Sequence, residues 1–112
     1  MPRYEVFESH RFIKDVEESA VWILLSNIDE SESQAEKKLN EFRDSINSLK
    51  ERLQDYPESG EPSNIPGLRR FPVYQGRYSI LWAVSHIAKS VTLITLSDSK
   101  YPKKLRQFQF DE

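Results

Sequence analysis

The sequence contains no cysteine, which excludes disulfide bonds, thiolate nucleophiles and cysteine-ligated metal sites. Its two histidines, His10 and His86, lie far apart in the chain, so we expect no metal site and ordinary surface positions for both. The three glycines form no phosphate-binding loop, and no cofactor is expected. Because no apolar run approaches the roughly 18 residues of a membrane span and the N-terminal residues lack the apolar region of a signal peptide, we expect a cytoplasmic protein without membrane contact.

What the sequence does contain is typical of a folded protein. Hydrophobic residues make up 38% of the 112 residues and aromatic residues 12%, which favours a packed core over disorder. A chain of this length can form a single hydrophobic core without disulfide bonds or metal ions to stabilise it. We therefore predict a single domain over residues 1–112.

Charge is distributed unevenly along the chain. Residues 1–65 carry 8 basic and 15 acidic side chains, a balance of -7, whereas residues 66–112 carry 8 basic and 3 acidic ones, a balance of +5. A basic C-terminal half suits contact with a phosphate backbone or an acidic partner protein. Alternatively, the two halves neutralise each other within the folded molecule.

The N-terminal half predicts a short strand and two helices. Tyr4–Phe7 alternates as a strand does, and Ser9 caps a helix that runs to about Ser26. Its apolar stripe is broad enough that we expect much of its surface, Trp22 included, to be buried. The residues of this stripe are Phe12, Ile13, Val16, Ala20, Val21, Ile23, Leu24, Leu25 and Ile28.

A second helix is predicted after a connection over residues 27–31. Ser33 and Glu36 have the spacing of a capping box, and Pro57 and Gly60 end the helix. An apolar seam then recurs at alternating steps of four and three residues, which suits packing on a sheet or, alternatively, a coiled coil. The seam consists of Ala35, Leu39, Phe42, Ile46, Leu49, Leu53 and Tyr56.

The C-terminal half predicts a meander of three antiparallel strands, at Leu68–Tyr74, Arg77–Ser85 and Val91–Leu96. Pro72 has no N–H to donate and makes the first of these an edge or bulged strand. Residues 58–66 are predicted as a loop, and Trp82 as a core residue. The fold class is therefore α+β, in which a strand, a helical hairpin and the meander form one sheet.

This order of elements resembles the RelE/ParE superfamily of bacterial type II toxins over nearly the whole chain. The matching pieces are Pro57 and Gly60 after the second helix, the Gly67–Arg70 segment, the Gly76–Trp82 segment and the final strand. The resemblance implies a toxin held inactive by a cognate antitoxin. The toxin's target would be DNA gyrase, as in ParE-like members, or ribosome-bound mRNA, which RelE-like members cleave. A catalytically silent interaction module of the same fold is the alternative.

The resemblance also implies site residues. In a ribosome-dependent nuclease, Arg70, Arg77 and Lys100 would surround the reacting phosphate, with Tyr101 near the ribose 2′-hydroxyl. Pro72 and Ser79 stand where that branch has basic residues, so the acid–base set is incomplete and enzymatic activity stays open. Nucleic-acid or partner contacts are expected from the basic residues Arg69, Lys103, Lys104 and Arg106. The plainer alternatives are a solvated sheet edge for the arginines and a solubilising tail for the others.

Overall fold

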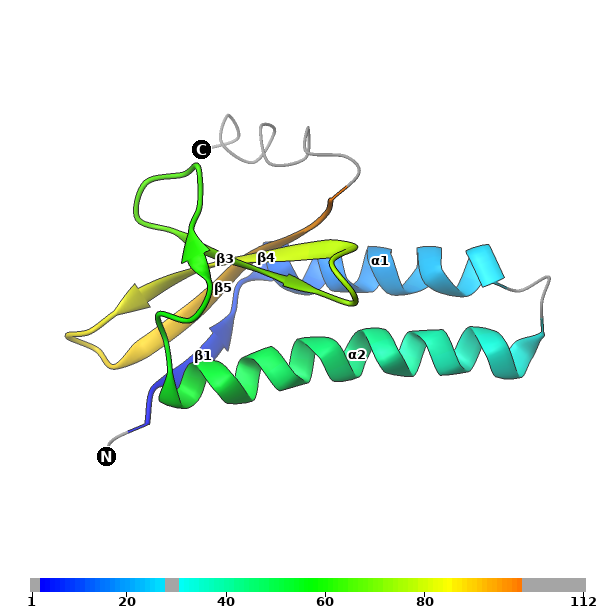
Figure 1. Ribbon diagram of the computed structural model, residues 1–112, viewed down its shortest axis with the longest axis horizontal. Coiled ribbons are helices and arrows are strands. Elements are labelled where there is room, and N and C mark those ends of the chain that lie inside the picture. Colours follow the sequence, from blue (N-terminus) through cyan, green and yellow to red (C-terminus); the bar gives the residue numbers. More distant parts are fainter. Residues whose placement is uncertain (1–2, 28–30, 100–112) are drawn as a thin grey trace.

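The computed structural model describes residues 3–27 and 31–99, which form two helices and a five-stranded sheet (Figure 1). This architecture confirms the predicted α+β class and the order of strand, helical hairpin and meander. Among these residues, neither helix has the length and apolar character needed to cross a bilayer. In chain order the elements are β1 (Glu5–Glu8), α1 (His10–Asn27), α2 (Glu32–Asp55), β2 (Glu61–Pro62), β3 (Arg69–Val73), β4 (Tyr78–Ser85) and β5 (Ser90–Asp98).

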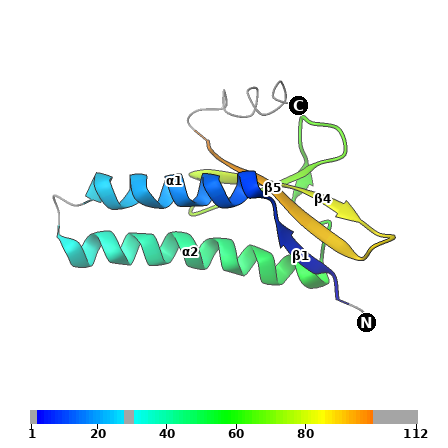
Figure 2. The same ribbon diagram turned by 180° about the vertical axis from the view of Figure 1, so that it is seen from behind.

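The strands lie in the order β1-β5-β4-β3-β2. β1 pairs with β5 in parallel, and every other pairing is antiparallel. Parallel neighbours need a long crossover connection, which the helical hairpin begins and the meander completes. The hairpin covers one face of the sheet, and α1 and α2 lie side by side (Figures 1 and 2). The opposite face carries no helix within the described residues.

The seam of α2 packs on the sheet as predicted. Phe42 and Leu53 are fully buried, and the Phe42 ring lies 5.2 Å from the ring of Tyr78 on β4. Leu39 is partly buried at the rim of the core. Tyr56, however, was wrongly placed in the seam: it is the C-cap residue, its conformation is no longer helical, and its side chain is 67% exposed.

The edge of β5 is completed by α1 rather than by another strand. β1 pairs only with Ser90–Leu93, so the second half of β5 needs other hydrogen-bond partners. The Ser9 hydroxyl donates to the carbonyl of Ile94 (2.8 Å) and accepts the N–H of Phe12 (3.0 Å), which confirms its predicted capping role. Asp15 Oδ2 then accepts hydrogen bonds from the Thr95 hydroxyl (2.5 Å) and the Leu96 N–H (3.2 Å).

The start of α2 differs from the prediction by two residues. Ser31, not Ser33, is the N-cap, and its hydroxyl accepts the N–H of Gln34 at 3.1 Å. Ser31 and Gln34 have the same capping-box spacing as Ser33 and Glu36, so two overlapping patterns competed. The earlier serine adopts the extended backbone that a cap requires, with φ 173°.

The predicted loop over residues 58–66 contains a short strand that the sequence did not reveal. β2 pairs Glu61 with Arg70 and Pro62 with Arg69, so the first part of β3 is not an edge. Pro72 lies beyond this pairing, where the strands that the structure describes adjoin β3 only on the β4 side, which suits a residue without an N–H. Two residues are too few for an alternating pattern to be recognised.

The two tryptophans have opposite environments. Trp82 is fully buried, as predicted, and its indole N–H donates to the Pro57 carbonyl at 2.8 Å. Trp22 was predicted to be buried and is instead 58% exposed. The apolar stripe of α1 is wider than the strip that the sheet and α2 can cover, so Trp22 lies on the outer side.

Burial of Tyr78 generates a pH prediction. Loss of hydration raises the pKa of Tyr78 above the ordinary value of 10.0, against the opposing effects of Arg77 and Ser19. Since the pKa is higher in the folded state, its contribution to stability is fully present below pH 10 and is lost as pH rises through the folded-state pKa. We expect the free energy of unfolding to fall more steeply above pH 10 in the native chain than in Tyr78→Phe. Urea titrations across this range test it, and parallel profiles would contradict it.

Truncation of the α2 seam gives a second prediction. Leu49 is 3% exposed within the core, so Leu49→Ala should lower the free energy of unfolding by roughly 2–5 kcal/mol. The matched control is Leu25→Ala on α1, where a leucine that is 60% exposed should cost about 0.5 kcal/mol or less. Chemical denaturation measures both. Equal small losses would mean that the seam does not face the sheet.

Candidate functional site

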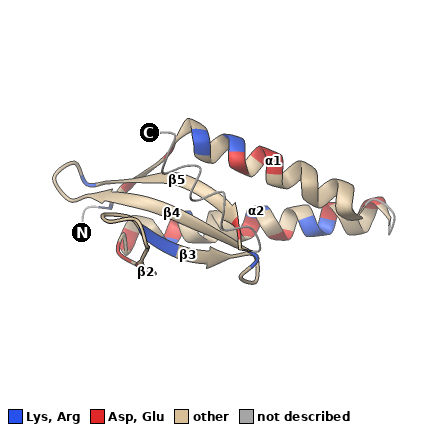
Figure 3. Cartoon of the chain, turned by 90° about the horizontal axis from the view of Figure 1, so that it is seen from above, with Lys and Arg blue, Asp and Glu red and all other residues tan. Residues whose placement is uncertain are grey.

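The face of the sheet away from the helices contains a groove where β3, β4 and the end of β5 meet the segment that begins with β2. Figure 3 looks onto this face, with basic residues at the start of β3. The groove has a volume of about 340 Å³. Residues from four segments line it: Pro62, Asn64, Arg70, Ser79, Leu81, Ser97, Asp98 and Ser99.

Arg70 is the basic residue of this groove. It lies opposite Leu81 on β4, on the face away from the helices, because successive side chains of a strand alternate between faces. Its Nη1 donates to Glu61 Oε1 at 2.5 Å, and its Nη2 donates to the Ser79 hydroxyl at 3.1 Å. The guanidinium is therefore held in place by β2 on one side and β4 on the other.

The remaining polar side chains of the groove are hydroxyls and a carboxylate. Ser79 and Ser97 face each other across β4 and β5 and are both buried. Ser99 donates its hydroxyl proton to the carbonyl of Gly76 at 2.9 Å, which ties the end of β5 to the β3–β4 turn. Among the described lining residues, Arg70 is the one cation, and Asp98 and the neighbouring Glu61 are carboxylates. This set can orient a polar partner, but it offers a phosphate little electrostatic stabilisation.

Gly60 allows β2 to approach β3. Its φ is +81°, and a Cβ at this position would lie 2.3 Å from the carbonyl oxygen of Arg70. Arg69, on the helix-covered face, donates to the carbonyls of Ser59 (3.4 Å) and Gly60 (3.1 Å). The two adjacent arginines thus serve opposite faces: Arg69 holds the loop before β2, and Arg70 lies in the groove.

The structure separates the predicted site residues. Arg70 lies in the groove, whereas Arg77 lines another pocket, beside Tyr74 and the end of α1. Arg69 contacts the loop carbonyls and not the groove. Five predicted positions lie outside the described residues: Lys100, Tyr101, Lys103, Lys104 and Arg106.

Glu61, which pairs with Arg70 beside the groove, was not identified from the sequence. It lay inside a predicted loop, and its only signal was a carboxylate in a segment otherwise rich in proline and serine. No group of three potential metal-ligating side chains occurs among residues 3–27 and 31–99.

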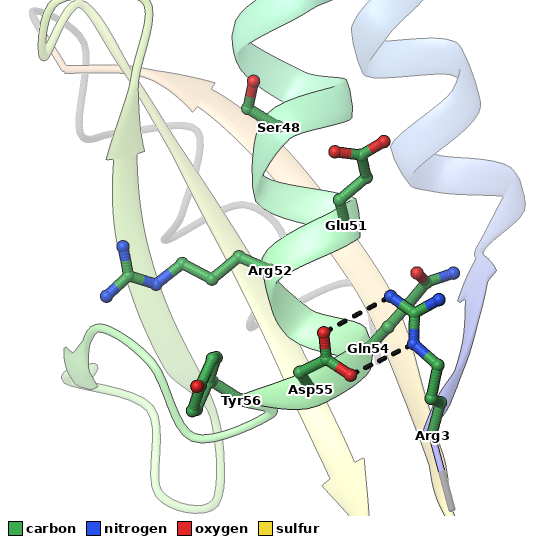
Figure 4. Close-up of a pocket in the computed structure, with 7 residues that line it drawn as sticks. All are labelled: Arg3, Ser48, Glu51, Arg52, Gln54, Asp55 and Tyr56. Atoms are coloured by element: carbon green, nitrogen blue, oxygen red, sulfur yellow. Dashed lines mark hydrogen bonds and ion pairs between the residues drawn. The ribbon is translucent and has the colours of Figure 1, made fainter.

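Two further surface features lie away from the groove. At the end of α2, a hollow of about 840 Å³ contains Arg3, whose guanidinium forms a two-point ion pair with Asp55 (Figure 4). Figure 4 shows Arg52 pointing away from this pair. Close to this hollow, just after the last residue of β4, His86 bridges the Tyr4 hydroxyl (2.6 Å) and Glu58 (2.9 Å), and so joins the residue before β1 to the loop after α2. His86 is exposed, as predicted, but it has a structural role.

No protein-family model matches the chain, and no curated protein matches its sequence. Solved structures do share its fold. A chain of the chromosomal ParDE TA system from P. aeruginosa superposes with a TM-score of 0.61 at 16% identity, covering 85% of this chain and 95% of that one. A chain of the intact E. coli RelBE toxin–antitoxin complex gives 0.50 at 16% identity, with coverages of 86% and 96%.

A third match is a chain of the RelBE2 toxin–antitoxin complex from Mycobacterium tuberculosis, with a TM-score of 0.50, 14% identity and coverages of 88% and 93%. At such low identity the comparisons establish the fold and not the activity. They confirm that the resemblance noted in the sequence extends to the arrangement of helices and strands over most of the chain.

The contact at Gly60 generates a prediction for the groove. Gly60→Ala should lower the free energy of unfolding by several kcal/mol, because the added methyl group both collides with the Arg70 carbonyl and strains a backbone at φ +81°. The matched control is Gly67→Ala, where φ is +85° but no atom lies within 4 Å of the added Cβ. Strain alone should cost about 1–2 kcal/mol there. Thermal or urea denaturation compares the two, and equal losses would exclude a steric contribution at Gly60.

Proposed function

We propose that this protein is the toxin component of a bacterial toxin–antitoxin module and is neutralised by a cognate antitoxin. The observation that carries the proposal is the fold, which nearly the whole chain shares with chains from ParDE and RelBE systems. Helical hairpin, sheet and meander occur in the same arrangement there. The open face and the uneven charge of the chain are consistent with a macromolecular partner.

We further propose that the toxin acts by binding its target, as expected of a ParE-like protein directed at DNA gyrase. Cleavage of RNA through the 2′-hydroxyl needs a base, an acid and cations around the phosphate. In the described part of the groove, the guanidinium of Arg70 is already engaged by Glu61 and Ser79. The separation of Arg77 from this groove also favours binding over cleavage.

The second candidate is cleavage of ribosome-bound mRNA. It is favoured by the position of Arg70, whose side chain lies in an open groove at the place where the resemblance puts a phosphate-contacting arginine. Lys100 and Tyr101, the other members of that proposed set, lie outside the described residues. A catalytically silent interaction module is the third candidate. It predicts that expression of the protein leaves bacterial growth unchanged.

Induced expression in bacteria separates these candidates. We expect growth arrest in which pulse-labelled DNA synthesis stops before protein synthesis, with mRNA left uncut in primer extension. Arg70→Ala should retain this order of events. The matched control is Arg3→Ala, which removes another ion-paired arginine far from the groove. If A-site cuts appear in mRNA and fall by about 10²–10³ in rate in Arg70→Ala, the protein is a nuclease. Unimpaired growth would support the silent module.

A further inference from the structure

The cation of the groove is already paired with a carboxylate of the chain itself. β2 lies beside the start of β3 (Figure 3), and Glu61 and Arg70 are directly opposite each other in this pairing. Their side chains therefore share one face of the sheet. Glu61 Oε1 accepts a hydrogen bond from Arg70 Nη1 at 2.5 Å, and the Ser79 hydroxyl accepts one from Nη2 at 3.1 Å. Any anion that enters the groove must compete with a carboxylate that is already in place.

The backbone that carries Glu61 is held on both sides. Before it, the Pro57 carbonyl accepts the indole N–H of the buried Trp82 at 2.8 Å. After it, the Ser63 N–H donates to the Leu68 carbonyl at 2.9 Å. A carboxylate tethered in this way has an effective concentration beside the guanidinium of at least the order of millimolar, which a free anion must exceed.

The ion pair is nevertheless within reach of a ligand. The side chain of Arg70 is 39% exposed and that of Glu61 is 61% exposed, so a ligand can meet the guanidinium without any change in the core. With Glu61 included, the described charged side chains of the groove are one guanidinium and two carboxylates, the second being that of Asp98. The volume of about 340 Å³ has room for a phosphate group, but the balance of charge opposes it.

We propose that Glu61 is a specificity determinant of the groove: its carboxylate occupies the anion-binding position on Arg70 and excludes phosphate groups, whether free or in nucleic acid. Without this carboxylate, the guanidinium is available for two-point hydrogen bonding to phosphate oxygens. The inference rests on the proposed function, because it gives a physical reason why a toxin of this fold binds its target without cleaving RNA. It adds the residue that makes the distinction.

The test measures binding of two probes to the full chain at constant ionic strength. The probes are inorganic phosphate and a short single-stranded RNA with 2′-O-methyl groups, which cannot be cleaved through the 2′-hydroxyl. NMR titration suits weak binding, and the Nε–H signal of Arg70 reports on the groove directly. Glu61→Gln keeps the shape of the side chain and removes its charge. It should lower the dissociation constant for both probes at least about tenfold, because the tethered competitor is lost and one carboxylate no longer repels the phosphate.

The matched control is Glu58→Gln. Glu58 lies in the same segment with a side chain that is 62% exposed, but it pairs with His86 and not with the arginine of the groove. Because this variant removes the same charge at a screened distance from the groove, its affinity for either probe should change by less than about twofold. Combining Glu61→Gln with Arg70→Gln should return the affinity to that of the native chain, because the phosphate loses its guanidinium. Circular dichroism and urea denaturation establish that each variant is folded.

Several results would overturn the proposal. Equal or weaker binding by Glu61→Gln than by the native chain would show that the carboxylate does not oppose phosphate. An equal gain in Glu58→Gln would mean that net charge alone governs binding, and a gain that survives Arg70→Gln would place the probe outside the groove. A gain for inorganic phosphate alone would show that Glu61 does not exclude nucleic acid. The titrations involve neither antitoxin nor target, so their failure leaves the toxin hypothesis intact, whereas unimpaired growth in cells would remove that hypothesis without altering the titrations.

Discussion

The hydrogen bonds between α1 and the free edge of β5 determine the placement of most other elements. β1 is too short to complete β5, and an unpaired edge strand exposes donors and acceptors to any other chain. Ser9, which caps α1, and Asp15 in its second turn supply hydrogen-bond partners to that edge. They also fix the direction in which α1 leaves the sheet. α2 then packs antiparallel to α1 and covers the same face, and the groove lies on the opposite face.

The elements with a long and regular pattern could be predicted from the sequence, and the short ones could not. The seam of α2 and the three strands of the meander have enough residues for periodicity to identify the buried side. β2 has two residues, and its position depends on Gly60, whose close approach to Arg70 becomes apparent only in three dimensions. Tyr56 continued the seam in spacing, but the helix had already ended, so the pattern alone gave the wrong burial.

The sequence drew attention to Arg70, which lies in the groove, but not to the way the chain arranges the other arginines around it. Strand alternation separates Arg69 from Arg70, and the turn carries Arg77 toward the helices instead of the groove. Their closeness in sequence suggested one basic cluster, whereas the structure gives each a different neighbour. Trp22 shows the opposite limitation. Its burial was inferred from the breadth of the apolar stripe around it, and only the arrangement of the sheet and α2 shows that there is too little surface to cover it.

The proline in β3 has a consequence for the behaviour of the protein at high concentration. Beyond the short pairing with β2, the outer side of β3 has no neighbouring strand among the described residues and could accept a strand from another molecule. Pro72 removes one donor from this segment, which makes an added strand less stable and disfavours stacking of sheets into aggregates. The same residue that stands where the resemblance would place a basic side chain therefore disfavours edge-to-edge association of a sheet whose outer strand is incompletely paired.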